Sequence, residues 1–233
     1  MRFKKLFKIH YYYFFSKINI IIVSICFILI QLLHIVLWQQ NLGNSVADEM
    51  IIDFVISSIF TIEKMILVFF SILMIGNFCL PEKDDYKVLY VYNEENVSKF
   101  YLTKFVTIDL FLLGFHFIVF IFFELLGMLY IKTFVVEIQH IKFFLYLYLI
   151  GVTYGHLTTI ILKILPSNLT VFIVFILFLV SDVFNYNWIF NTFFPSLDLT
   201  LLKVENTHYD INLFIISLFY FVISIICQRG NNS

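Results

Sequence analysis

Charge is scarce in this chain of 233 residues, of which Asp, Glu, Lys and Arg make up only 13%. Soluble globular domains carry about 25% charged residues. Together with a hydrophobic share of 61%, the deficit excludes an ordinary soluble globule. The net charge is −1, so the basic excess that would favour binding to nucleic acid is missing too.

Cysteine is also rare, and its spacing excludes the usual cysteine chemistry. The chain has three cysteines (Cys26, Cys79 and Cys227) and no CxxC. An odd number without paired spacing does not suit a disulfide framework. We therefore expect buried, unreactive thiols.

Catalytic and nucleotide-binding motifs are missing as well. The sequence contains no GxxxxGK[ST] phosphate-binding loop, no HExxH and no GxSxG, and its six histidines are scattered. We expect no cofactor, metal or catalytic residue in this chain. Any active transport would take its energy from another chain or from an ion gradient.

Long apolar runs dominate what is present. A helix that crosses the hydrocarbon core needs about 20 apolar residues, and its backbone must satisfy its own hydrogen bonds there. The runs predict an all-α integral membrane protein with six transmembrane helices, at about 18–38, 55–80, 105–130, 142–163, 169–186 and 211–227.

The distribution of Lys and Arg predicts the orientation, because cytoplasmic connections are enriched in both. With the N-terminus inside, eleven of these residues lie on the cytoplasmic side and four on the outer side. Both termini and the connection between the second and third spans are therefore predicted to be cytoplasmic. The first apolar run lacks a small-x-small cleavage site, so we expect a retained span rather than a signal peptide.

Two segments outside the spans are distinctive. Residues 1–16 place Phe3, Leu6, Phe7, His10 and Phe14 on one helical face, which predicts an amphipathic interfacial helix in the headgroup layer. The alternative is a plain basic anchor on the cytoplasmic side. Residues 17–233 form a single six-span domain. Its outer segment 186–210 is too apolar for a free loop, which favours a re-entrant segment in the outer leaflet.

Ionisable residues inside the spans are costly and invite a functional interpretation. Asp109, His116 and Glu124 fall within an 80° arc of the third span. They predict a polar stripe along a substrate path or a subunit interface. The alternative is that Asp109 and Glu124 reach headgroup water while His116 is an ordinary core histidine.

Two further intramembrane features have mainly structural interpretations. Gly151 and Gly155 form a GxxxG that permits close helix approach in the fourth span. Glu63 and Lys64 are adjacent in the second span and point about 100° apart, so each is expected to find its own partner or water.

The segment 81–104 holds nine of the chain's charges between two predicted spans. It must lie in water, where a soluble partner can reach it. Residues 88–92 within it are apolar, and the alternative to a partner contact is a solvated loop. The candidate contact residues are Glu82, Asp84, Asp85, Lys87, Glu94, Glu95 and Lys99.

This order of elements resembles the permease subunits of ABC-2 type transporters, also called type V exporters. Such permeases have a glutamate after the second span, a short helix, a basic residue and a lysine entering the third span. The matching positions are Glu82, Lys87–Tyr92, Lys99 and Lys104, and Phe193-Phe194-Pro195 resembles the outer re-entrant region. Asp85-Tyr86 stands where a glycine-threonine pair is usual.

The resemblance implies a partnership. Two permease subunits, identical or related, would pair in the cell membrane, and each would contact a cytoplasmic ATPase that binds ATP and Mg²⁺. The contact would be made by segment 81–104, with the apolar residues 88–92 as a docking helix and the charges at its rim. Small permeases of this size in AT-rich Gram-positive bacteria often export amphipathic toxins such as phenol-soluble modulins, or give immunity to lantibiotics. The expected partners are thus the ATPase, a second permease, membrane lipids and amphiphilic cargo.

Two other functions remain open on sequence. An intramembrane enzyme would need ionisable groups that converge at one depth, with His116, Glu124 and His156 as the first suspects. A substrate-binding membrane subunit of an uptake transporter would enclose a pocket within one chain.

Overall fold

The structure is a computed structural model, and helices make up nearly all of the part of the chain that it describes. It describes residues 3–15, 17–42, 49–79, 94–130, 135–184, 192–197 and 207–229, and no strand occurs among them. The helices are α1 (Phe3–Phe14), α2 (Lys17–Leu42), α3 (Glu49–Phe78), α4 (Glu94–Tyr130), α5 (Ile138–Ile164), α6 (Leu169–Val183) and α8 (Thr207–Arg229).

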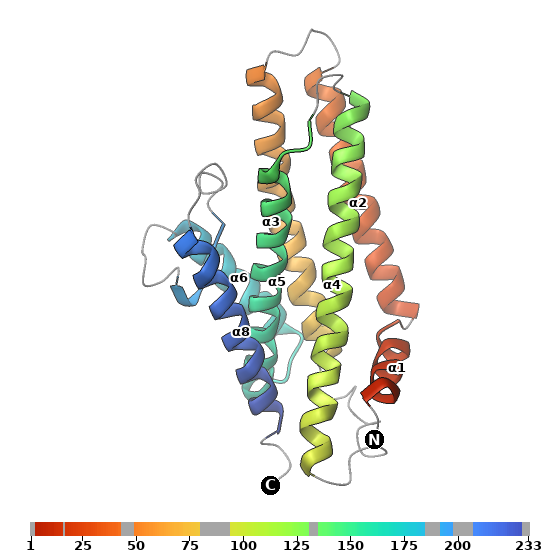
Figure 1. The fold of residues 1–233 in the computed structure, drawn as a ribbon, viewed down its shortest axis with the longest axis vertical. Coiled ribbons are helices and arrows are strands. Elements are labelled where there is room, and N and C mark those ends of the chain that lie inside the picture. The colour runs from red at the N-terminus through yellow and green to blue at the C-terminus, as the bar shows by residue number, and fades with distance from the viewer. Residues whose placement is uncertain are drawn as a thin grey trace.

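Four long helices, α2 to α5, run along the long axis of the molecule, and the shorter α6 and α8 lie beside them (Figure 1). Helix α5 contacts α3, α4, α6 and α8. In their most apolar windows, α3 is 67% buried and α5 is 72% buried, whereas α2 is 11% buried. The core of the bundle is therefore the pair α3 and α5, and both chain ends lie at the end where α1 packs (Figure 1).

Five of these helices are long and apolar enough to cross a membrane. They cover Asn19–Gln39, Ile52–Phe78, Val97–Tyr130, Ile138–Ile164 and Tyr209–Gln228, which agrees with five of the six predicted spans. Helix α6 has 15 residues, about 22 Å of helix, against a hydrocarbon core of about 30 Å. A complete crossing by α6 stays a prediction, as do the six-span count and the cytoplasmic termini.

Helix α4 begins earlier than the predicted third span. It starts at Glu94 rather than near residue 105 and continues for 37 residues. Its first turns bury Val97, Phe100 and Tyr101. This apolar face gives the extra turns a packing partner, α1, that a hydropathy pattern alone does not reveal.

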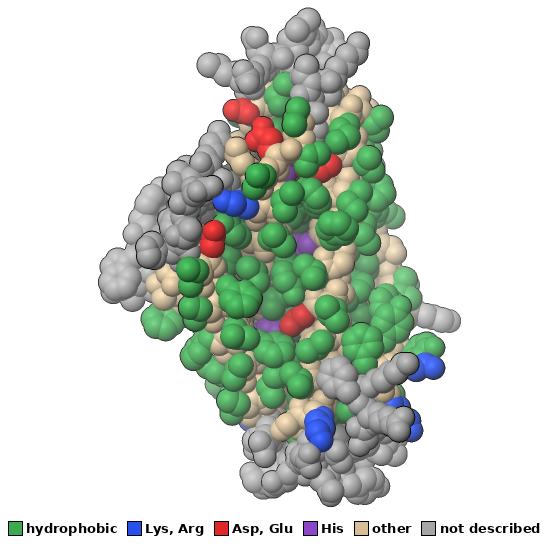
Figure 2. Space-filling model, in the orientation of Figure 1, with side chains coloured by type: hydrophobic (Ala, Val, Ile, Leu, Met, Phe, Trp, Pro, Cys, Tyr) green, Lys and Arg blue, Asp and Glu red, His purple; other side chains and the backbone are tan. Residues whose placement is uncertain are grey.

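The outer surface is apolar over most of its height. Large hydrophobic side chains are exposed along α2, α4, α6 and α8, among them Leu29, Phe117, Phe172 and Phe214. Figure 2 shows them covering the middle of the visible face, with Lys and Arg mainly near the end that holds the termini. An apolar surface of this extent is suited to contact with lipid rather than with water.

The two glycines of the GxxxG lie where α5 meets α3. A Cβ at Gly151 would stand 2.7 Å from the Cβ of Ser71, and one at Gly155 would stand 2.1 Å from Cδ1 of Ile75. The backbones approach closely because neither position carries a side chain.

Replacing Gly151 with Ala should therefore push α5 away from α3. Overpacking of a tight contact costs about 1–3 kcal/mol, and we expect a lower midpoint of thermal unfolding in detergent. Gly114→Ala is the matched control, because nothing lies within 4 Å of its added Cβ. Equal midpoints for the two variants would contradict a close α3–α5 contact.

Candidate functional site

The first candidate site is the place where α1 packs against the end of α3 and the start of α4. We call it the α1 junction and define it by Leu6, His10, Phe14, Phe78, Phe100 and Lys104, all of them buried. The His10 ring lies edge-on to Phe100, with centroids 4.7 Å apart, and the Phe14 ring lies 5.1 Å from that of Phe78. The apolar face predicted for residues 1–16 is thus buried by protein on at least this side.

A buried lysine, Lys104, contacts aromatic rings in the junction. The Lys104 side chain is 1% exposed, and its Nζ lies 5.2 Å from the ring centre of Phe78 and 5.9 Å from that of Tyr101. Aromatic faces stabilise a cation in such a position. The helix ends on both sides of residues 80–93 are therefore joined through Phe78 and Lys104.

The turn from α1 into α2 is tied to the same place. The Asn19 amide donates to the Phe14 carbonyl at 2.7 Å, and the Asn77 amide donates to Asn19 Oδ1 at 3.1 Å. The elbow between α1 and α2 is thus bonded to the last turn of α3.

The pKa of His10 is lowered by its burial in the α1 junction. Burial, followed by the nearby Lys104 charge, lowers the pKa of His10 from 6.5 to about 4, against an opposing hydrogen bond to the Phe100 backbone. The imidazole is therefore neutral in the docked helix at physiological pH.

The predicted contact residues of segment 81–104 lie partly inside and partly outside the described residues. Glu82, Asp84, Asp85 and Lys87 lie outside the described residues. Glu94 and Glu95 belong to the first turn of α4, and the Lys99 side chain is exposed one turn later. The predicted helix 87–92 also lies outside the described part.

The second candidate site is the contact between α4 and α5, which we call the α4–α5 seam. Asp109 Oδ2 lies 3.2 Å from His156 Nε2, and Glu124 Oε1 lies 2.9 Å from His140 Nδ1. Between them the His116 ring meets Tyr148 with centroids 6.0 Å apart.

The register of the seam is regular. Steps of seven and eight residues along α4 match steps of eight along the antiparallel α5, which is two helical turns each time. The predicted stripe of Asp109, His116 and Glu124 therefore faces α5 of the same chain. The two carboxylates take histidine partners that the sequence analysis did not assign.

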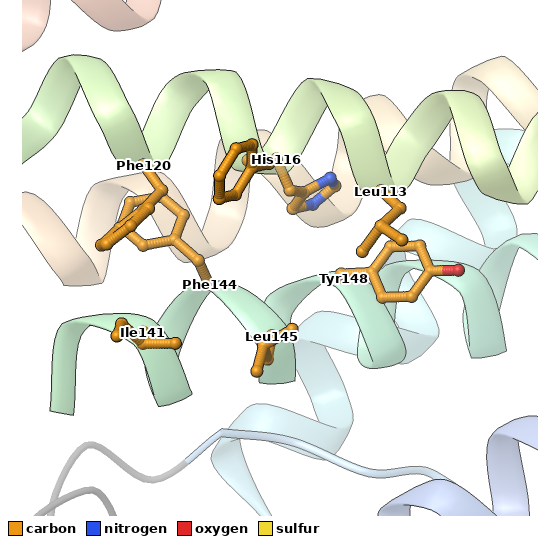
Figure 3. Close-up of a pocket in the computed structure, with 8 residues that line it drawn as sticks. Leu113, His116, Phe120, Ile141, Phe144, Leu145 and Tyr148 are labelled. Carbon is orange, nitrogen blue, oxygen red and sulfur yellow. The ribbon is translucent and has the colours of Figure 1, made fainter. Parts of the chain in front are cut away.

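His116 differs from its neighbours on the stripe. Its Nδ1 lies 2.8 Å from the Leu112 carbonyl of its own helix. Its Nε2 is buried and has no hydrogen-bond partner among the described residues. It lines an apolar pocket of about 200 Å³ between α4 and α5 (Figure 3).

The three suspects for an enzyme do not converge. Asp109 and Glu124 are 15 residues apart on the continuous α4, about 22 Å along its axis, and His156 lies beside Asp109. His116, Glu124 and His156 thus lie at different depths. Within the described ranges, no three His, Cys, Asp or Glu side chains are placed to hold a metal ion.

The adjacent Glu63 and Lys64 find separate partners, as predicted. Glu63 Oε1 lies 2.6 Å from His34 Nε2, with both side chains fully buried. Lys64 donates to Asp182 at 2.7 Å and to the Leu197 carbonyl at 3.3 Å. These contacts join α3 to α2 and to α6, and their partners were not predicted because they lie 29 and 118 residues away.

Part of the predicted outer segment 186–210 is described at 192–197. Its carbonyls accept hydrogen bonds from α8, where Tyr209 donates to Ser196 at 2.7 Å and Tyr220 to Phe193 at 3.2 Å. Leu197 is buried. These six residues thus pack on α3 and α8, and a re-entrant path for the whole segment stays a prediction.

Comparison with models of known protein families gives no match, and neither does comparison with curated proteins.

The His34–Glu63 pair allows a stability test. His34→Leu leaves the Glu63 carboxyl buried without its partner, which costs about 3–5 kcal/mol in such pairs. The double variant His34→Leu/Glu63→Leu should recover much of this loss, as measured by unfolding in mixed detergent micelles. Additive effects of the two single substitutions would contradict a direct pair.

Docking of α1 should depend on pH through His10. Undocked His10 takes up a proton below about pH 6.5, whereas docked His10 does so only near pH 4. Docking is therefore complete above pH 6.5 and weakens by up to about 3 kcal/mol as the pH falls toward 4.

Hydrogen exchange of the amides of residues 3–15, corrected for the intrinsic pH effect, measures this docking. His10→Phe keeps the aromatic packing and should remove the pH dependence. The account of His10 fails if the variant and the wild type respond to pH alike.

Proposed function

We propose that this chain is the membrane-spanning permease subunit of an ATP-driven exporter of the ABC-2 type. A separate cytoplasmic ATPase would hydrolyse ATP and act on the charged segment 81–104. The observation that carries the proposal is the α1 junction, which ties the helix ends on both sides of that segment to each other and to α1.

The α1 junction would allow a displacement of segment 81–104 to be transmitted to the helices on both sides of it. A loop between two loosely packed helices would absorb a displacement of its own residues. Here Phe78, at the end of α3, and Lys104, in the early turns of α4, are in contact, and α1 packs on α4. A push on residues 80–93 would therefore be passed to three helices together.

The chemistry of the chain fits a subunit that does not hydrolyse nucleotide. The sequence contains no phosphate-binding loop. The exposed Lys99 and the acidic residues of 82–95 supply a charged rim for a soluble partner.

Cargo and assembly follow from the same proposal. The exposed apolar faces of α2, α4 and α8 suit lipids, a second permease subunit and amphiphilic cargo such as antimicrobial peptides. The Lys and Arg distribution favours a cytoplasmic position for α1 and both termini. The spans would lie in the plasma membrane.

The competing functions have less support. The residues suspected for an intramembrane enzyme do not form one cluster, because Glu124 pairs with His140 at one end of the seam and His156 pairs with Asp109 at the other. A substrate-binding uptake subunit would enclose its ligand, whereas the pocket between α4 and α5 is lined in part by Phe117 and Leu145, which are exposed on the outer surface.

Purification of a tagged chain from its native membrane tests the proposal. We expect an ATPase to co-purify and to hydrolyse ATP in the complex. Charge reversal at Glu82 and Asp84 together should release it and abolish export.

Glu137→Lys is the matched control, because Glu137 is exposed at the start of α5, at the opposite end of the bundle. It should leave the complex intact. An intact complex after reversal at Glu82 and Asp84, or equal release by Glu137→Lys, would contradict coupling through this segment.

A further inference from the structure

The exposed side of α1 is basic and carries two tyrosines. Lys5 and Lys8 are exposed, and so are Tyr11 at 46% and Tyr12 at 66%. Nζ of Lys8 lies 5.8 Å from the ring centre of Tyr12. We call this surface the basic face of α1. The helix contains no Asp or Glu, so its own residues do not neutralise the charge.

The basic face lies opposite to the side of α1 that packs on protein. The buried side belongs to the α1 junction and contacts α4. At about 100° per residue, Lys5, Lys8 and Tyr12 point about 170° away from it. The basic face therefore points away from the bundle. A free interfacial helix would instead turn its apolar face to the lipid, so docking reverses which side of α1 meets the membrane.

The position of α1 along the bundle is that of a headgroup layer. Only two residues separate α1 from α2, and the first turns of α2 expose Ile20 at 46% and Ile21 at 56%. These side chains mark where the apolar surface begins. Figure 2 shows Lys and Arg side chains at the edge of this surface, at the end of the molecule where Figure 1 places α1.

Charge complementarity selects the partner of the basic face. Among the described residues neither Lys5 nor Lys8 has a carboxylate partner. Lysines beside a span are attracted to anionic lipids, and tyrosine rings favour the boundary between headgroups and hydrocarbon. An acidic protein would satisfy the charge, but the adjacent Ile20 and Ile21 require lipid at the same edge.

We propose that the basic face of α1 binds the headgroups of anionic phospholipids, while the apolar side of the helix stays in the α1 junction. The ammonium groups of Lys5 and Lys8 contact lipid phosphates, and the ring of Tyr12 lies at the level of the glycerol backbone. This binding requires no ATPase and is independent of the exporter proposal.

Photo-cross-linking of the full chain, without any partner, tests the proposal. The chain is placed in phosphatidylcholine nanodiscs that contain a trace of photoreactive phosphatidylglycerol or photoreactive phosphatidylcholine. Both probes carry a diazirine at the same position near the glycerol backbone, and labelled peptic peptides are mapped by mass spectrometry. We expect residues 5–12 to be labelled at least about five-fold more by phosphatidylglycerol. High salt should reduce this preference, because it screens exposed charges.

Variants separate the two lysines from the general attraction of the protein for anionic lipid. The preference should fall about five-fold for each lysine removed in Lys5→Gln/Lys8→Gln, and it should persist in Lys5→Arg/Lys8→Arg. Lys142→Gln is the matched control, because Lys142 is a partly exposed lysine near the start of α5, at the opposite end of the bundle. It should leave the labelling of 5–12 unchanged.

Equal labelling of 5–12 by the two probes would overturn the proposal, and the basic face would then meet water or an acidic protein. A preference that survives Lys5→Gln/Lys8→Gln, or that Lys142→Gln reduces equally, would overturn it as well. The wild-type comparison of the two probes and its salt dependence need no variant, so they decide the question even if a substitution disturbs α1.

Discussion

The close contact between α3 and α5 is the constraint on which the rest of this structure depends. Gly151 and Gly155 let the two backbones approach until Ser71 and Ile75 fill the space of the missing side chains. Without water in the membrane, helix association relies on packing of this kind rather than on the hydrophobic effect. The pair forms the buried centre, and α2, α4, α6 and α8 take positions around it.

Polar pairs then fix how the surrounding helices are placed. Glu63 and Lys64 leave α3 in different directions and bind His34 of α2 and Asp182 of α6. Asp109 and Glu124 of α4 bind two histidines of α5. An ion pair or hydrogen bond of this type is specific for one register, because a shift by one residue would separate both partners. The seam therefore orients α4, and the turns of α4 that extend beyond it carry the α1 junction.

The sequence was sufficient for the helical class and for five helices long and apolar enough to cross a membrane, because a run of about 20 apolar residues is a local signal of such a helix. It also placed Asp109, His116 and Glu124 on one face. It did not identify His140 and His156 as partners, because these contacts depend on how two helices pair across a connection. The early start of α4 was missed for a similar reason, since the helix there is stabilised by α1. The α6 crossing and the role of all the candidate contact residues between 82 and 99 stay predictions.

The central claim is that the α1 junction moves as a unit when an ATPase acts on segment 81–104. Spin labels at the exposed Lys5 of α1 and Lys99 of α4, in the complex of permease and ATPase, test this claim most directly. The distances between the labels are measured by pulsed electron–electron double resonance. ATP should leave the Lys5–Lys99 distance within one chain unchanged, and should change the Lys99–Lys99 distance between paired permeases. A change within the chain, with the distance between chains constant, would contradict the account.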